Sequence, residues 1–400
     1  MKIYILKSLA ALLNFLLISF VVRELPNDLA GDYILILGYI VLGALIVGLG
    51  IDTGVERYAR RLLVAWSRLQ LMLAILAISV VRTGLLFAFV ALANFVHPGL
   101  LNVEGYAFAL AFFTFWFTTL SSVLNGVLLY MASAISNLIR AALRFLIFVL
   151  PMSALSLDAM LTVELFSAGC AALYSVVVFM QRPIEISSTV PASRTVFRFL
   201  GWNYLSRLFL NLVSLNTVKI LVLRSNHPNA VLFAYAIQLT ESAEKFLPSV
   251  VLAGQYRPAL SKAFDEGAFD HLRRRLRNLG LKSLASSSLM SLLQLAALPL
   301  AFILLQDENP AGFWPLIALC AAWLFVANFK FSLNIVSNVI EANHIQLFAS
   351  FAIAVIFFGG VWANTITKPF SLMLWMLLCN LCYPFIWAAM ARNILFSNGK

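Results

Sequence analysis

The sequence predicts an all-α integral membrane protein with about 12 transmembrane helices in two six-helix bundles related by pseudo-two-fold symmetry. Apolar residues make up 62% of the 400 residues and charged residues only 11%, far from the composition of a soluble chain. The apolar residues gather in runs of about 20, long enough for a helix to cross a hydrocarbon core of about 30 Å. Features of the first half also recur in the second half.

Each apolar run is expected to form one membrane helix. The runs lie at 4–22, 33–51, 71–96, 105–130, 137–155, 159–180, 199–222, 231–254, 281–305, 313–339, 345–364 and 369–391. One set of alternate loops carries most of the lysine and arginine, whereas the opposite set holds only Arg23, Arg224 and Lys368. The positive-inside rule therefore predicts cytoplasmic termini and explains the formal net charge of +11 without a nucleic-acid partner.

The two halves of the chain read as copies of one unit. A shift of 200 positions places Lys7 on Arg207, and after the basic segment 262–282 a shift of 209 places Asn125 on Asn334. An even number of helices in each copy makes the copies parallel, with an axis along the membrane normal. The expected domains are an N-terminal six-helix bundle at 1–180, a cytoplasmic linker at 181–198 and a C-terminal six-helix bundle at 199–400.

One predicted helix, 231–254, carries charge at its centre. Glu241, Glu244 and Lys245 lie near its middle, and Gln238 shares a face with Glu241 and Lys245 at helical spacing. Charge at membrane depth needs either solvent or an opposite charge. This face is therefore expected to line a watery cavity.

Matched polar stripes on other helices are expected to supply the remaining walls of the cavity. The polar lining comprises Lys7, Asn14, Thr118, Asn125, Asn203, Asn211, Gln238, Asn334 and Ser337. The deep cations are Arg82, Arg207, Lys245 and Lys330. A cation facing lipid at the bilayer centre would cost about 2.5 to 3.5 kcal/mol. Acidic residues that could couple movement to protons or cations are Asp52, Glu241, Glu244 and Glu341.

Several of these residues also have a simpler interpretation. Lys245 could pair only with Glu241, which lies four residues earlier on the same helix. Lys219 and Arg144 are expected to snorkel to a nearby interface. The serines and threonines of 105–130 could serve helix packing alone.

No metal, cofactor or catalytic chemistry is predicted. The four histidines are scattered over loops and helix ends, without the spacing of a metal site. Cys379 and Cys382 form a CxxC inside an apolar run, where they are expected to be packing residues. No loop is long enough to hold a catalytic domain, so a transporter is expected rather than an enzyme. The basic segment 272–277 is expected to form a short helix on the anionic inner leaflet.

Two segments carry a resemblance to a known family. The loop RELPNDLAGD and the segment GLGIDTGVERYARR, which leads into a basic stretch, resemble the N-terminal signature of Wzx-type O-antigen flippases. These lipid-linked oligosaccharide flippases belong to the polysaccharide transporter family of the multidrug/oligosaccharidyl-lipid/polysaccharide exporter superfamily. The resemblance implies a MATE/flippase-like, V-shaped pair of bundles that opens alternately to each side of the bacterial inner membrane. It also implies a polysaccharide polymerase and chain-length proteins as partners.

The substrate that the resemblance implies is an undecaprenyl-diphosphate-linked oligosaccharide, a repeat unit of O-antigen in lipopolysaccharide or of another surface polysaccharide. Under this hypothesis the diphosphate is bound by Arg82, Arg207, Lys245 and Lys330. Asparagine, serine and threonine side chains of the stripes bind sugar hydroxyls. The alternative is a small-molecule or drug antiporter of the same superfamily, which would need an anionic cavity for cationic drugs; the deep cations argue against it.

Overall fold

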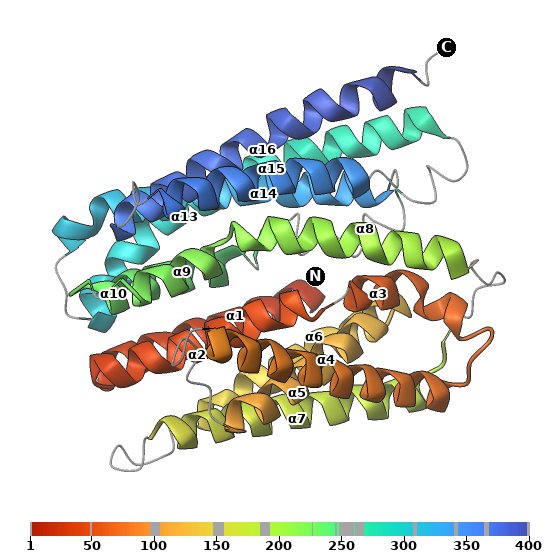
Figure 1. Cartoon of the computed structure of the whole chain (residues 1–400), viewed down its shortest axis with the longest axis horizontal. Helices are drawn as coiled ribbons and strands as arrows, with labels where there is room; N and C mark the ends of the chain where they lie inside the picture. The colour runs from red at the N-terminus through yellow and green to blue at the C-terminus, as the bar shows by residue number, and fades with distance from the viewer. Residues whose placement is uncertain are drawn as a thin grey trace. The chain divides into compact units, whose positions relative to one another are not determined.

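The computed structural model describes residues 2–48, 50–96, 105–146, 156–184, 193–225, 227–244, 246–247, 260, 268–306, 310–339, 343–363 and 368–397. Across these ranges every regular element is a helix (Figure 1), which confirms the all-α membrane fold. Within them, nine helices are long and apolar enough to span a membrane, and a pair bent by 44° makes ten if it forms one span. Two further predicted runs form α6 and α10, which have 15 residues each.

The chain divides into two compact units. The N-terminal unit comprises Met1–Leu17 and Asp28–Tyr204, and the C-terminal unit comprises Ile18–Asn27 and Leu205–Lys400. The division falls inside α1 (Lys2–Glu24) and inside α8 (Ser193–Leu212). The predicted domains at 1–180, 181–198 and 199–400 stay a prediction.

In the N-terminal unit, α5 is the central helix (Figure 1). The helices are α2 (Asn27–Ile46), α3 (Ile51–Leu62), α4 (Arg68–Val96), α5 (Gly105–Gly126), α6 (Tyr130–Arg144) and α7 (Leu157–Gln181). α5 packs against α3, α4, α6 and α7, and the shared core includes Ile75 of α4, Phe117 of α5 and Phe179 of α7. Ala171 and Ala172 of α7 are fully buried in this core, where small side chains let helices approach closely.

The helix predicted over 33–51 is in fact two helices, because α2 ends at Ile46 and α3 begins at Ile51. Gly50 has a φ of +69°, a left-handed conformation that glycine adopts without steric cost. A Cβ atom on Gly50 would lie 2.8 Å from the carbonyl oxygen of Leu200, so a larger residue would clash with backbone. The break places Asp52 in the first turn of α3, inside the unit.

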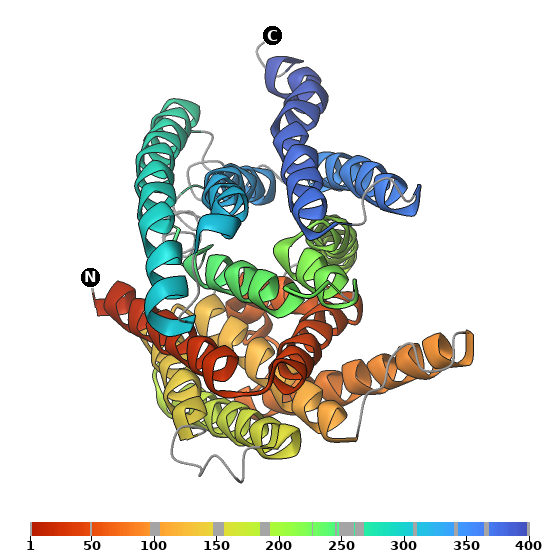
Figure 2. The same ribbon diagram turned by 90° about the vertical axis from the view of Figure 1, so that its left-hand side faces the viewer.

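In the C-terminal unit, α14 is the central helix (Figures 1 and 2). The elements are α9 (Leu215–Leu223), α10 (Ala230–Glu244), α13 (Phe269–Gln306), the 3-10 helix η3 (Pro310–Phe313), α14 (Trp314–Val339), α15 (Asn343–Trp362) and α16 (Pro369–Ser397). α14 packs against α10, α13, α15 and α16. The bent pair is α8 with α9, whose axes meet at 44° across a short break before Leu215.

Two predicted helices of this unit have different bounds. The basic segment 272–277 is not a separate short helix, because α13 runs without interruption over 38 residues. At 1.5 Å per residue α13 is about 57 Å long, so it exceeds the hydrocarbon core and its basic end extends a membrane helix. The helix predicted over 231–254 ends at Glu244, and a turn at Phe246 and Leu247 leads into Pro248, which disfavours helix in the preceding residue.

Candidate functional site

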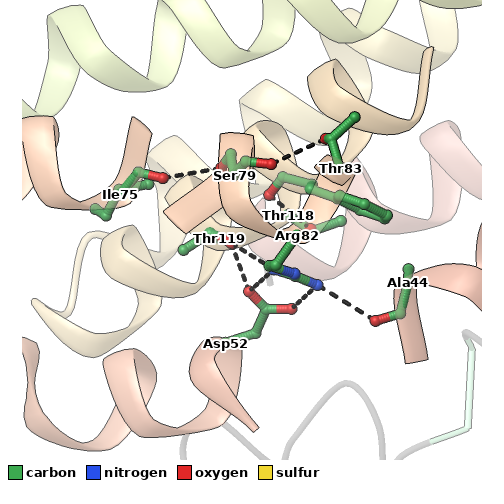
Figure 3. A network of polar contacts seen from close by, with 9 residues as sticks. Ala44, Asp52, Ile75, Ser79, Arg82, Thr83, Thr118 and Thr119 are labelled. Atoms are coloured by element: carbon green, nitrogen blue, oxygen red, sulfur yellow. Dashed lines mark hydrogen bonds and ion pairs between the residues drawn. The ribbon is translucent and has the colours of Figure 1, made fainter. Parts of the chain in front are cut away.

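An ion pair between Arg82 of α4 and Asp52 of α3 lies inside the N-terminal unit (Figure 3). Arg82 is only 1% exposed, and its Nη1 and Nη2 donate to Asp52 Oδ1 at 3.1 Å and Oδ2 at 3.3 Å. Thr119 of α5 donates to Asp52 Oδ1 at 2.6 Å and accepts from Arg82 Nη1 at 3.0 Å. Arg82 Nη2 also donates to the carbonyl oxygen of Ala44 in α2 at 3.4 Å. The pair therefore ties α2 and α3 to α4 and α5.

This arrangement makes Arg82 a cross-link between helices. The fork of the guanidinium is occupied by the Asp52 carboxylate, the geometry in which arginine binds a carboxylate most strongly. The Phe115 ring lies against it, with 4.7 Å between the ring centre and Cζ. Thr118 donates to the Phe115 carbonyl oxygen at 3.0 Å within α5. The structure thus joins a predicted diphosphate ligand to a predicted ion-coupling residue, and both transport roles stay predictions.

A second charged cluster of the N-terminal unit is centred on Glu164 of α7, which is fully buried. Glu164 Oε1 accepts from Tyr33 OH and from Arg144 Nε, each at 2.5 Å. Arg144 of α6 also donates Nη1 to Asn14 Oδ1 of α1, which brings one predicted lining residue into the cluster. The expectation that Arg144 snorkels to an interface is wrong, because a buried carboxylate holds its guanidinium inside the unit.

Arg140, one helical turn before Arg144, adds a second guanidinium. Its Nη2 lies 3.9 Å from Glu164 Oε2, and its Cζ lies 5.1 Å from the centre of the Phe117 ring. Two guanidinium groups thus face a single carboxylate, which leaves the cluster with a net charge of about +1. Across the described ranges, neither Arg140 Nε nor Glu164 Oε2 has a hydrogen-bond partner.

A polar stripe on α6 leads to this cluster. Its residues recur at helical spacing and are Ser133, Asn137, Arg140 and Arg144. Ser133 shares a hydrogen bond of 2.8 Å with Ser121 of α5, and Asn137 donates to the Ser133 carbonyl oxygen at 2.8 Å. The apolar run at 137–155 does not reveal this stripe, because α6 begins at Tyr130, before the run starts. Glu164 was not among the predicted site residues, although a lone carboxylate in the apolar run 159–180 is a signal for one.

In the C-terminal unit, Lys330 of α14 lies at the break between α8 and α9. It is 5% exposed, and its Nζ donates to the carbonyl oxygens of Leu210 at 2.9 Å and Val213 at 3.3 Å. Asn380 of α16 accepts from Lys330 Nζ at 3.0 Å and donates to the Val213 carbonyl oxygen at 3.3 Å. A break in a helix frees carbonyl groups that need donors, and these two side chains supply them. The predicted diphosphate role of Lys330 stays a prediction.

Lys219 of α9 binds two residues of α10. Its Nζ donates to Gln238 Oε1 at 2.5 Å and to Glu241 Oε2 at 2.9 Å, and the side chain is 3% exposed. The expectation that Lys219 snorkels is therefore wrong, because Glu241 offers a carboxylate inside the unit. Glu244 accepts a hydrogen bond from Trp323 Nε1. The predicted residues Lys245 and Glu341 lie outside the described residues.

The other predicted site residues occupy buried or half-buried positions. They are Lys7, Asn125 and Asn203 in the N-terminal unit, and Arg207, Asn211, Asn334 and Ser337 in the C-terminal unit. Asn211 donates to the carbonyl oxygen of Arg207 at 2.8 Å, which is a bond within α8. Asn334 accepts from Gln346, and Ser337 accepts from Trp387 Nε1 at 2.8 Å. The predicted diphosphate ligands are thus divided, with Arg82 in one unit and Arg207 and Lys330 in the other.

Comparisons with known proteins identify the fold. No protein family model and no curated protein matches the chain. A transporter of the MOP superfamily from Pyrococcus furiosus, described as having a binding pocket of reverse polarity, matches with a TM-score of 0.68 at 13% identity, over 98% of this chain and 94% of its own. A variant of the MATE transporter VcmN from Vibrio cholerae matches with a TM-score of 0.66 at 15% identity, over 97% and 95%.

A third solved structure is similar over the same length. An outward-facing multidrug resistance MATE family transporter of the MOP superfamily matches with a TM-score of 0.66 at 13% identity, over 98% of this chain and 93% of its own. At these identities the likeness establishes the fold. The chain therefore is a multi-pass membrane protein with the fold of MATE transporters of the MOP superfamily.

Proposed function

We propose that this protein is a flippase that moves an undecaprenyl-diphosphate-linked oligosaccharide from the cytoplasmic to the periplasmic leaflet of the bacterial inner membrane by alternating access. The fold supports a transporter, because the solved structures that share it are transporters. In this role both termini are cytoplasmic. The polymerase and chain-length proteins that use the flipped repeat unit are the expected partners.

The observation that carries the proposal is the excess positive charge around Glu164. Arg140 and Arg144 face this single carboxylate inside a bundle of apolar helices. An excess cation at membrane depth costs several kcal/mol unless an anion or water balances it. A diphosphate offers two anionic groups whose oxygens accept paired hydrogen bonds from guanidinium, so it would balance the charge during transport.

The polar side chains beside the arginines suit a sugar. Ser121, Ser133 and Asn137 lie within hydrogen-bond reach of one another at the side of α6 that carries Arg140. Hydroxyl and amide groups both donate and accept, as sugar hydroxyls require. A glycan next to a diphosphate would therefore meet complementary groups in the same order along α6.

A drug antiporter is the second candidate, because one transporter of this fold is a multidrug resistance protein. Exporting a cationic drug requires a carboxylate that can receive it. Three acidic residues at membrane depth already form ion pairs, as Asp52 with Arg82, Glu164 with Arg144 and Glu241 with Lys219. At these three carboxylates a cationic drug would have to displace an arginine or lysine, which favours the anionic substrate.

Complementation tests the proposal. The gene is expressed in a bacterial strain that lacks its oligosaccharide flippase, and surface polysaccharide is resolved on a gel. Restored polysaccharide is the expected result, with purified protein in liposomes translocating a fluorescent undecaprenyl-diphosphate oligosaccharide. The opposite result has three parts: the wild-type protein is present in the membrane, it restores polysaccharide in none of the glycan backgrounds tested, and it exports cationic dyes. That result would contradict the flippase proposal and support the drug antiporter.

A further inference from the structure

We propose that α6 and α7 form a phosphate-binding site inside the N-terminal unit, with Arg140 as its ligand and Glu164 as an internal competitor that keeps binding reversible. The site contains none of the four cations that the sequence predicts as diphosphate ligands, which are Arg82, Arg207, Lys245 and Lys330. It deepens the proposed function and rests on it for the identity of the natural ligand. The two arginines of α6 differ in how many hydrogen-bond partners they have.

Arg144 has a full set of partners. Its Nε donates to Glu164 Oε1 at 2.5 Å, its Nη1 donates to Asn14, and its Nη2 lies 3.4 Å from Tyr33 OH. Its side chain is 13% exposed. Arg144 is therefore bound into the unit and neutralised by Glu164.

Arg140 has no such set. Its contact with Glu164 is a distance of 3.9 Å, too long for a hydrogen bond, and its Nε is without a partner among the described residues. Arg144 lies four residues further along α6, so two like charges meet at the spacing where they repel. A bound anion would relieve this repulsion and fill the open donors of Arg140.

Exposure indicates the side from which an anion would reach the cluster. The Arg140 side chain is 22% exposed, whereas that of Glu164 is fully buried. The Phe117 ring centre lies 5.1 Å from the Arg140 Cζ, within the range of a cation–π contact. An anion can therefore reach the Arg140 side chain, whereas the Glu164 carboxylate is closed to it.

Phosphate is the ligand class that this arrangement favours. The planar fork of a guanidinium matches two oxygens of one phosphate group, and arginine keeps its charge in an apolar site. The phosphate could belong to the diphosphate of a transported lipid or to an anionic phospholipid headgroup. Because Glu164 also attracts Arg140, the bound anion always competes with a built-in carboxylate, which limits affinity and permits release.

The test is the binding of inorganic pyrophosphate to the purified full-length protein, measured by isothermal titration calorimetry in zwitterionic nanodiscs. Arg140→Gln is expected to weaken binding about tenfold, because it removes a charge-assisted hydrogen-bond donor. Arg140→Lys is expected to weaken it about threefold, because lysine keeps the charge and loses the fork. Glu164→Gln is expected to tighten binding about threefold, since it removes the competing charge.

The matched control is Arg61→Gln. Arg61 belongs to the same unit and also lies over an aromatic ring, with 5.9 Å from its Cζ to the Tyr58 ring centre, and its loss changes the net charge equally. Pyrophosphate affinity is expected to be unchanged. Equal affinity in wild type and Arg140→Gln, or weaker binding in Glu164→Gln that still folds, would overturn the site.

Protection from chemical modification keeps the test decisive if a variant does not fold. Pyrophosphate is expected to protect Arg140 of the wild-type protein from phenylglyoxal, as read by mass spectrometry, and equal labelling with and without it contradicts the site. Protection by nanodiscs of anionic lipid without pyrophosphate would assign the site to headgroups. If the protein complements the flippase-deficient strain but does not bind pyrophosphate, the phosphate site is wrong and the flippase function stands. If it binds pyrophosphate but does not complement, the flippase function is wrong and the phosphate site stands.

Discussion

Replacing Arg82 by methionine tests whether this deep cation is a structural tie. The substitution keeps an unbranched side chain of similar length and removes the ion pair with Asp52 and the donors to Thr119 and Ala44 (Figure 3). Removing one partner of a buried pair costs about 3–5 kcal/mol. Asp52 is 30% exposed, so water recovers part of that cost, and we expect a loss of about 2–4 kcal/mol in unfolding free energy.

The assay is thermal unfolding of the purified protein in detergent, followed by tryptophan fluorescence at one fixed scan rate. For a unit of this size each kcal/mol shifts the midpoint by about 2–4 °C, so Arg82→Met is expected to lower it by about 4–16 °C. Asp52→Asn still offers an acceptor to Thr119, but it leaves the buried Arg82 guanidinium without its counter-charge, so it is expected to cost at least as much as Arg82→Met. In the double variant the effects should fall short of additivity by about 1 kcal/mol or more.

These three variants form a double-mutant cycle, which also separates an effect on stability from an effect on transport. Additive effects within about 0.5 kcal/mol would refute the pairing of Arg82 with Asp52 and the reasoning built on it. If the double variant regains stability and also restores surface polysaccharide, Arg82 acts as a tie alone. Regained stability with transport still lost would support the predicted role of Arg82 as a diphosphate ligand.

Three further substitutions test other contacts. Lys330→Met is expected to cost about 2–4 kcal/mol because it removes the lysine donor from the Leu210 carbonyl oxygen and leaves the Val213 carbonyl oxygen only its bond from Asn380; an unchanged melting midpoint would contradict this. Glu241→Gln is expected to cost about 1–3 kcal/mol, since buried Lys219 loses its counter-charge. The unfolding free energy is measured by urea titration in mixed micelles, and a value equal to that of wild type would contradict this pairing. Gly126→Ala should lower the midpoint because its Cβ would lie 2.6 Å from a backbone oxygen, whereas Gly84→Ala, in open space, should raise it slightly; equal shifts would count against the packing.

Membrane helices could be predicted from hydropathy because the bilayer imposes one length on all of them. The run at 71–96 corresponds to α4 at Arg68–Val96, and the run at 313–339 corresponds to α14 at Trp314–Val339. The break between α2 and α3 could not be predicted in this way, because glycine is common inside membrane helices. What separates the two helices is the positive φ of Gly50, at a position where the Leu200 carbonyl oxygen, 150 positions away in sequence, leaves no room for a Cβ atom.

The candidate site was only partly predictable for the same reason. Depth in the membrane marked Arg82 correctly as a buried cation, but its partner Asp52 lies 30 positions away across a loop. For Arg144 and Lys219 the sequence predicts snorkelling, because long cationic side chains in apolar runs usually extend toward a nearby interface. Glu164 lies 20 positions from Arg144, on the next helix, and only the packing of α6 against α7 brings the two together.

A deep lysine or arginine in a membrane sequence can be balanced by a carboxylate, by the carbonyl groups of a broken helix or by a ligand. The structure holds examples of the first two: Arg82 pairs with Asp52, and Lys330 binds the break between α8 and α9. Such cations stabilise the protein, and they can hold a substrate only by giving up a partner. Arg140 differs, because its one carboxylate is already committed to Arg144. A ligand should therefore bind where positive charge is in excess. In an alanine scan of the deep cations, replacing the paired ones should lower stability, whereas replacing Arg140 should impair transport.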